Sequence, residues 1–145
     1  MKYSFFLFAL VTSFFVRAQD LTEEQLPGEV KKTFTATYPS ASEVKWEKKK
    51  ELYKAGFKTG KTDHDVWLSA DGKVTKHRFE IKKEELPAVI TETIKKDFSG
   101  YKIDDCEKTE AKGIASYKVE LKSDAGKKNV HFDADGKVIT KKNDD

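Results

Sequence analysis

The sequence predicts an α+β fold of two tandem units, each a helix followed by a four-stranded antiparallel sheet, with the helices packed on one sheet face. The first observation is an internal repeat: Tyr53-Lys54 recurs as Tyr117-Lys118 at a spacing of 64 residues. The second is an apolar residue at every fourth position in two segments, which indicates helices with one buried stripe. The third is alternation of apolar and polar residues after each segment, which is typical of half-buried strands.

Residues 1–18 have the features of a secretory signal peptide. A basic residue near the start precedes an apolar run at 5–16, and Val16-x-Ala18 suits a cleavage site, which leaves Gln19 first. At about 1.5 Å per residue the run spans roughly 18 Å, short of a hydrocarbon core of about 30 Å. We therefore expect export to the periplasm or medium, with no membrane span after cleavage.

Each unit begins with a predicted helix. Pro27 and Pro87 suit the first helical position, where a missing N–H costs nothing, and Pro39 and Gly100 end the helices. The apolar stripes are Val30, Phe34 and Tyr38 in the first unit and Ile90, Ile94 and Phe98 in the second. One stripe cannot bury a sheet face alone at this size. We therefore expect both units to share one core.

The predicted strands follow each helix. The residues expected to face the helices are Tyr53, Phe57 and Leu68 in the first unit and Tyr117, Leu121 and Phe132 in the second. Asp71-Gly72 and Asp135-Gly136 each lie between apolar strands and predict tight hairpin turns with positive φ. The second unit has four more residues before its Tyr-Lys pair than the first. We expect them to form a longer hairpin loop.

This order of motifs resembles the exported PepSY-like proteins, also described as β-lactamase-inhibitor-protein-like and found mainly in Bacteroidetes. A signal peptide precedes two units with a Leu-Pro helix, a Tyr-Lys strand and an Asp-Gly hairpin, over about residues 26–141. The resemblance implies helices on one face of an antiparallel sheet, an extracytoplasmic location and a role in binding or inhibiting proteins. It implies no catalytic or binding residues. We expect repeats at 19–83 and 84–145 that form one compact unit.

The charge pattern argues against a nucleic-acid partner. The whole chain carries 28 Lys and Arg against 25 Asp and Glu, a net charge of +3. Loss of Lys2 and Arg17 with the signal peptide leaves 26 basic against 25 acidic residues, a net charge of +1. Arg78 is then the one remaining arginine, whereas base and phosphate recognition depend heavily on arginine. Lysines and acids alternate instead of forming a basic block.

No motif in the sequence predicts an enzyme active site, a cofactor or a metal. Cys106 is the single cysteine, and we interpret it as a small buried apolar residue rather than a reactive thiol or an intermolecular disulfide. His64 lies between Asp63 and Asp65, which allows either a weak surface site for zinc or copper or a solvated turn. We favour the turn.

Two function classes remain. The first is a non-enzymatic binding protein that recognises or inhibits another protein or peptide in the cell envelope, and the alternative is a periplasmic protein that binds a small molecule or metal. For the first class, the alternation turns Trp67 and His131 away from the helices. The residues expected to share this binding face are Trp67, His131, Lys54, Lys58, Lys118 and Lys122. The competing interpretation is that Trp67 is covered by the second unit, a loop or lysine stems.

Overall fold

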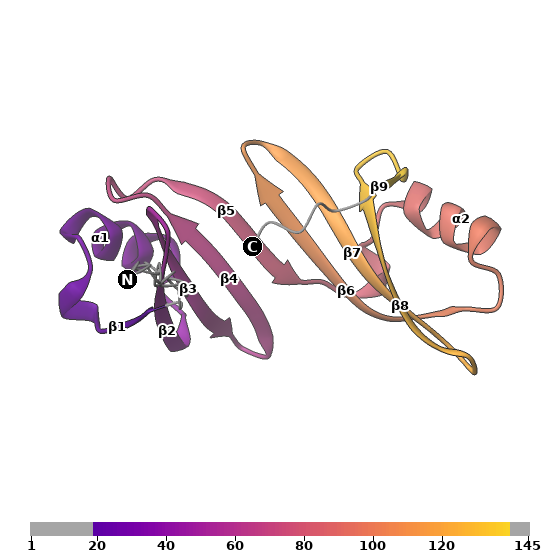
Figure 1. Ribbon diagram of the computed structural model, residues 1–145, viewed down its shortest axis with the longest axis horizontal. Coiled ribbons are helices and arrows are strands. Elements are labelled where there is room, and N and C mark those ends of the chain that lie inside the picture. Colours follow the sequence, from indigo (N-terminus) through magenta and orange to yellow (C-terminus); the bar gives the residue numbers. More distant parts are fainter. Residues whose placement is uncertain (1–18, 140–145) are drawn as a thin grey trace, which may run out of the picture.

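The computed structural model describes residues 19–139, which form one nine-stranded antiparallel sheet and two α-helices (Figure 1). The predicted signal peptide lies outside the described residues. The strands are β1 (Gln19–Leu21), β2 (Ser42–Lys49), β3 (Leu52–Thr59), β4 (Thr62–Leu68), β5 (Val74–Glu80), β6 (Lys102–Ala111), β7 (Ile114–Ser123), β8 (Gly126–Asp133) and β9 (Val138–Ile139). They follow one another across the sheet in chain order. The fold is therefore α+β, as predicted, but five strands instead of the expected four precede α2, because residues 19–21 add β1 to the edge of the sheet beside β2.

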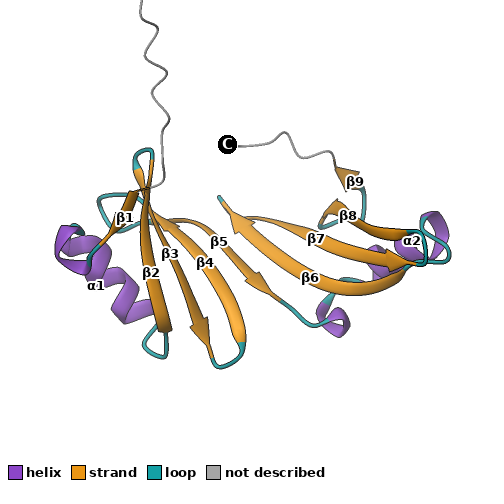
Figure 2. Cartoon of the chain, turned by 60° about the horizontal axis from the view of Figure 1, so that its bottom comes forward, coloured by secondary structure: helices purple, strands orange, loops and turns teal. Residues whose placement is uncertain are grey.

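The helices α1 (Gly28–Thr37) and α2 (Ala88–Asp97) lie near the two ends of the sheet (Figure 2). The register places them on the same face. Val66 of β4 is opposite His77, His77 is opposite Glu110, and Glu110 is opposite Ala115 of β7. Val66 belongs to the core beneath α1, and Ala115 packs against the core beneath α2. Because directly opposed residues share a sheet face, both helices cover one face and the other is open.

The helices begin one residue later than expected. Pro27 and Pro87 immediately precede the helices, with φ of −56° and −53° and extended ψ values. The stripe residues Val30 and Phe34 in α1, like Ile90 and Ile94 in α2, are buried. Tyr38 and Phe98 follow the last helical residues and are partly buried against the cores. The apolar spacing thus identified the buried face of each helix.

The expectation of one shared core is wrong, because the buried hydrophobic residues form two separate clusters. One lies beneath α1 and contains Phe34, Phe57 and Leu68, and the other lies beneath α2 and contains Tyr117, Leu121 and Phe132. The predicted helix-facing strand residues are thus in these cores, except Tyr53, which is partly buried. The halves meet through ladder pairing of β5 with β6 rather than through side-chain packing between the helices.

The four additional residues of the second repeat lengthen strands, not a loop. Two residues, Lys50 and Glu51, connect β2 to β3, and two, Lys112 and Gly113, connect β6 to β7. The expectation of a longer loop is therefore wrong, because β6 and β7 have 10 residues each where β2 and β3 have 8. The extension of β6 includes Glu110 and Ala111, which pair with β5 and so help join the halves.

Both predicted Asp-Gly turns are present and press against the helices. Gly72 has a φ of +81°, and a Cβ atom there would lie 2.6 Å from the carbonyl oxygen of Glu29 in α1. Gly136 has a φ of +80°, and its Cβ would lie 2.9 Å from the carbonyl oxygen of Val89 in α2. Glycine is thus needed twice over, for the left-handed backbone and for close approach to the helix.

Candidate functional site

The six residues predicted to share a binding face all lie on the open face. Lys54 is opposite Trp67 across β3 and β4, and Lys118 is opposite His131 across β7 and β8. Lys58 and Lys122 follow at even spacings along β3 and β7, so they point to the same side. The six do not form one cluster. Three strands separate β4 from β8, which at about 4.8 Å per strand gives Trp67 and His131 a lateral separation of roughly 19 Å, and the register adds an offset along the strands.

Trp67 is partly buried, and three cations surround its indole. The Nζ atoms of Lys76 and Lys54 lie 4.4 and 5.6 Å from the ring centroid, and the guanidinium carbon of Arg78 lies 5.8 Å away. These distances lie within the range of cation–π attraction. Lysine stems therefore cover part of the ring, as the competing interpretation expected, but no helix covers it. Part of the residue therefore remains exposed on the open face.

Asp65 fixes two of these cations. It lies two residues before Trp67 on β4, and its carboxylate accepts a bond from Lys54 Nζ at 2.9 Å and another from the Arg78 guanidinium. Burial by itself would raise the pKa of Asp65, but the hydrogen bonds and positive charges of Lys54 and Arg78 outweigh it and hold the pKa below its ordinary value. The carboxylate stays charged and orients both cations beside the indole.

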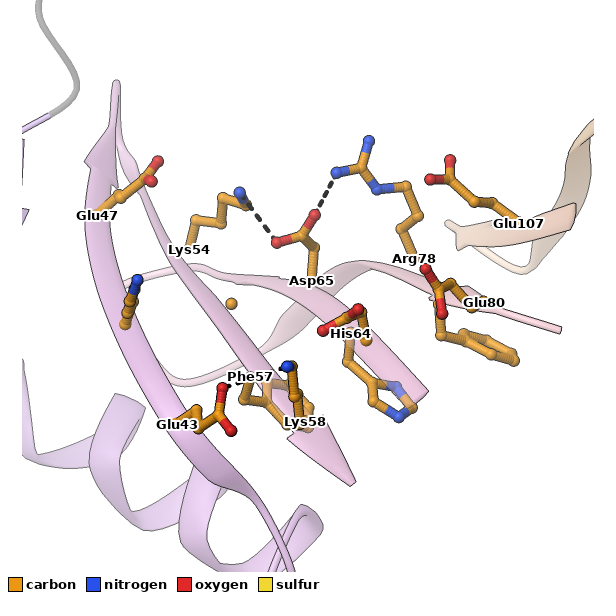
Figure 3. Close-up of a pocket in the computed structure, with 14 residues that line it drawn as sticks. Glu43, Glu47, Lys54, Phe57, Lys58, His64, Asp65, Arg78, Glu80 and Glu107 are labelled. Carbon is orange, nitrogen blue, oxygen red and sulfur yellow. Dashed lines mark hydrogen bonds and ion pairs between the residues drawn. The ribbon is translucent and has the colours of Figure 1, made fainter. Parts of the chain in front are cut away.

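The open face is hollowed between Lys54, Asp65 and Arg78, which Figure 3 shows at its rim, and Gly56 also lines this hollow. The hollow has a volume of about 500 Å³. Gly56 is opposite Asp65, and a Cβ atom at Gly56 would lie 3.3 Å from Oδ1 of Asp65. Charged side chains rim the hollow, including Glu43, which pairs with Lys58 at 3.3 Å, and Glu80 of β5. A missing side chain at one position therefore creates a polar depression on the open face.

The equivalent part of the second repeat is filled. The counterpart of Gly56 at the spacing of 64 is Glu120, and that of Trp67 is His131. Lys127 bonds Glu120 at 2.5 Å and Asp104 at 2.8 Å, and these bonds raise the pKa of Lys127 above its ordinary value. The open face is thus asymmetric: the first repeat offers an indole and a hollow, and the second offers a closed ion-pair network.

His64 is placed differently from either sequence interpretation. It lies within β4, where alternate residues point to opposite faces, so its imidazole points away from Asp63 and Asp65. The ring stacks on Phe57 with centroids 5.0 Å apart, and its Nδ1 lies 3.2 Å from Nε2 of His77. The proposed zinc or copper site with Asp63 and Asp65 is therefore wrong, and so is the solvated turn. Within residues 19–139 no group of three or more His, Cys, Asp or Glu side chains is placed to bind a metal.

Cys106 is buried in the core beneath α2, with 2% of its surface exposed. Burial is the main cause that raises the pKa of its thiol to about 11, and the charges of Asp105 and Glu84 add to the effect. A neutral, enclosed thiol is a poor nucleophile. This agrees with the interpretation of Cys106 as a buried apolar residue.

Sequence reasoning missed Asp65, Gly56 and Arg78 as parts of this site. Asp65 stood out only as a neighbour of His64, and nothing in the linear sequence pairs it with Arg78. The repeat itself could have identified Gly56, because the equivalent position of the second copy, 64 residues later, is a glutamate.

The comparisons with known proteins agree with the fold. The sequence model of the family described as "Putative beta-lactamase-inhibitor-like, PepSY-like" matches residues 14–76 and 51–140. A "putative periplasmic" protein of Bacteroides eggerthii is similar in structure, with a TM-score of 0.68 and 19% identity over 79% of this chain and 86% of that one. A search of curated proteins gave no significant match.

Two further solved structures share the fold. A DUF2874 family protein of Bacteroides ovatus has a TM-score of 0.65 and 20% identity, over 79% of this chain and 85% of that one. A BLIP-like protein of Bacteroides fragilis has a TM-score of 0.61 and 20% identity, over 79% of this chain and 83% of that one. In the described part of the chain, neither helix has the length and apolarity needed to cross a membrane. Because the family model matches most of its length, the chain belongs to the PepSY-like, beta-lactamase-inhibitor-like family.

Proposed function

We propose that this protein is an exported, non-enzymatic binding protein that recognises or inhibits another protein or peptide in the cell envelope. The observation that carries the proposal is the partly exposed Trp67 on a sheet face that neither helix covers. Large aromatic side chains ringed by polar groups are common anchors of protein interfaces. The family and the fold support a protein partner, and the "putative periplasmic" neighbour supports the location.

The cations around Trp67 favour binding over packing. Asp65 holds Lys54 and Arg78 in place, so ordering of these side chains is largely complete before a partner arrives. Preorganised side chains lower the entropy cost of association. The hollow over Gly56 is lined by the same Lys54, Asp65 and Arg78, and in the proposed complex it receives one partner side chain. We place the contact centre on the first repeat, with Lys58, Lys118, Lys122 and His131 at its periphery.

The organisation of the chain supports this proposal. We propose that residues 1–18 are removed on export, and that 19–83 and 84–145 are duplicated units joined in one continuous sheet, the first with α1 and five strands and the second with α2 and four described strands. Duplication gives two copies of the same face, of which only the first carries an indole and a hollow. A single partner-binding site per chain follows from this difference.

The experiment is capture of binding partners from the envelope extract of the protein's own cells. Trp67→Ala should reduce the captured partner at least severalfold, while the melting temperature changes by no more than about 4 °C, the shift expected for about 1 kcal/mol. Val89→Ala is the matched control, because Val89 is an exposed apolar side chain of α2 on the other face. Equal capture by wild type and Trp67→Ala would refute this site.

A further inference from the structure

A second hollow lies beside α2 on the helix-bearing face, away from Trp67. It has a volume of about 680 Å³ and is bounded by α2, the 98–101 loop and the start of β6. Its apolar wall is formed by Ile94, Phe98, Tyr101 and Ile103. Small-molecule sites have volumes of about 300–1,000 Å³, mostly apolar walls and a few convergent polar groups. The volume and the wall of this groove fit that description.

The charged groups around the groove are lysines. Lys83, Lys95 and Lys102 line it, and none of the described residues that line it is acidic. Lys128 of β8 reaches over the aromatic wall, with its Nζ 5.2 Å from the ring centroid of Tyr101. Lys95 and Lys128 form no ion pair with another described residue. Lys102 is opposite Lys122 across β6 and β7, so its side chain points to the open face and only its start borders the groove. Lys95 also complements the carboxyl end of α2, but the other three lysines belong to other segments.

The first repeat provides an internal comparison. At the spacing of 60, the counterparts of Lys83, Lys95 and Lys102 are Glu23, Thr35 and Ser42. The space beneath α1 is filled by rings, since Phe34 and Tyr38 lie 5.1 and 4.8 Å from Phe57 between centroids. In the second repeat the counterparts of Phe34 and Phe57 are the smaller Ile94 and Leu121. The groove and its lysines are thus specific to the second repeat.

We propose that this groove binds a small carboxylate with an apolar chain, of the kind represented by a free fatty acid. The chain lies along the wall formed by Ile94 and Phe98, where burial of apolar surface supplies most of the affinity. The carboxylate lies between Lys95 and Lys128, neither of which is paired with a described carboxylate. This ligand is recognised on the face opposite the proposed protein-binding surface, so the two proposals can fail separately.

The test is isothermal titration calorimetry of the purified exported protein with dodecanoate below its micelle concentration. We expect one molecule bound per chain. Acetate lacks the chain, and dodecyltrimethylammonium carries the same chain with a positive head, so both should bind at least tenfold more weakly. Equal binding of the cationic amphiphile would overturn the proposal by showing non-specific apolar binding, and absence of dodecanoate binding would also overturn it.

Variants locate the site. Lys95→Thr with Lys128→Gln removes both charges that face the carboxylate and should weaken dodecanoate binding about tenfold, as expected when two close charges are lost. Lys31→Thr with Lys32→Thr in α1 changes the net charge equally and should leave binding unchanged. Thermal melting verifies that both double variants are folded. Unchanged affinity in the first variant, or equal loss in both, would place the ligand elsewhere and overturn the assignment.

Discussion

The imidazoles of His64 and His77 are hydrogen-bonded to each other, with Nδ1 of His64 3.2 Å from Nε2 of His77. Nε2 of His64 also contacts the hydroxyl of Thr59 at 2.5 Å. Both imidazoles lie partly buried among Phe57 and Phe79 on the helix-bearing face. A single proton can bridge the two nitrogens, whereas two protonated rings would repel each other at this distance. The pair is therefore compatible with at most one positive charge.

This relationship predicts a loss of stability at mildly acidic pH. Burial lowers the pKa of His64, although the charge of Asp63 partly opposes this. The pKa of His77 is lowered by burial and by the charge of His64, and the charge of Glu110 partly opposes this. The unfolded chain, with histidine pKa values of about 6.5, therefore binds more protons, so stability falls as pH drops below about 6.5. Urea unfolding at pH 7.5 and 5.0 measures the difference.

The control for this prediction is a double variant, His64→Gln with His77→Gln. Its stability should change less between the two pH values than that of the wild type. His131→Gln removes the remaining histidine, which lies on the open face, and should keep the wild-type pH dependence. An identical pH dependence of wild type and double variant would show that other groups titrate in this window.

Asp65→Asn should destabilise the open face. The carboxylate accepts bonds from Lys54 and Arg78, and hydrogen bonds to charged groups contribute about 1.5–3 kcal/mol each. Asparagine keeps one acceptor oxygen and solvent screens the partly exposed Arg78, so the expected loss is reduced to about 1–3 kcal/mol. The pKa of Asp65 is lowered on folding, so this contribution is present above the unfolded value of about 3.9 and is lost as pH falls below it. Urea unfolding at pH 7 and pH 3 checks both the size and the direction. Asp63→Asn, on the same strand and face, should cost less than Asp65→Asn at pH 7.

The periodicity of the sequence was sufficient to predict the faces of the elements. The period of two in the strand predicted that Trp67 points to the other sheet face from Val66 and Leu68. The period of four in the helices predicted that Phe34 and Ile94 are buried. Both spacings follow directly from backbone geometry. His64 was misplaced for the same physical reason. The Asp-His-Asp motif suggested one cluster, but in a strand the middle residue points to the other face.

Long-range pairing could not be predicted. The bonds of Asp65 with Arg78 depend on the register of β4 with β5, which the linear sequence does not contain. Similarly, the separation of the cores depends on β5 pairing with β6. The two helices could equally have packed face to face if the repeats had associated through their apolar stripes. The continuous sheet holds α1 and α2 too far apart for a shared core.

The exported protein should begin at Gln19. The short apolar run and the Val16-x-Ala18 pattern predict cleavage after Ala18. Intact-mass measurement of the protein from the envelope fraction should give the mass of residues 19–145. Ala18→Arg, which places a large charged residue before the cut, should cause the uncleaved form to accumulate. A mass that includes Met1 in the wild type would contradict the prediction.

Gly72→Ala should cost more stability than Gly60→Ala. Both glycines have positive φ, +81° and +62°, so alanine carries a backbone cost of about 1–2 kcal/mol at either position. Gly60 has open space around it, but a methyl group at Gly72 would meet the Glu29 carbonyl and the Thr33 hydroxyl. Urea unfolding should therefore give Gly72→Ala a lower free energy of unfolding than Gly60→Ala. Equal losses would mean that the turn moves away from α1 at little cost.

The two cores predict that damage to one helix stays in its own half. Phe34→Ala removes a ring that lies 4.9 Å from Trp46 and 5.1 Å from Phe57 between centroids, and should cost about 3–5 kcal/mol, while Ile94→Ala should cost about 2–5 kcal/mol. Because the clusters share no buried residue, Phe34→Ala should reduce amide hydrogen-exchange protection mainly in β2 to β4, and Ile94→Ala mainly in β6 to β8. Thr35→Ala, an exposed position on α1, is the control and should leave both regions protected. Equal loss of protection across the whole sheet in either core variant would show that β5–β6 pairing makes the halves a single cooperative unit despite their separate cores.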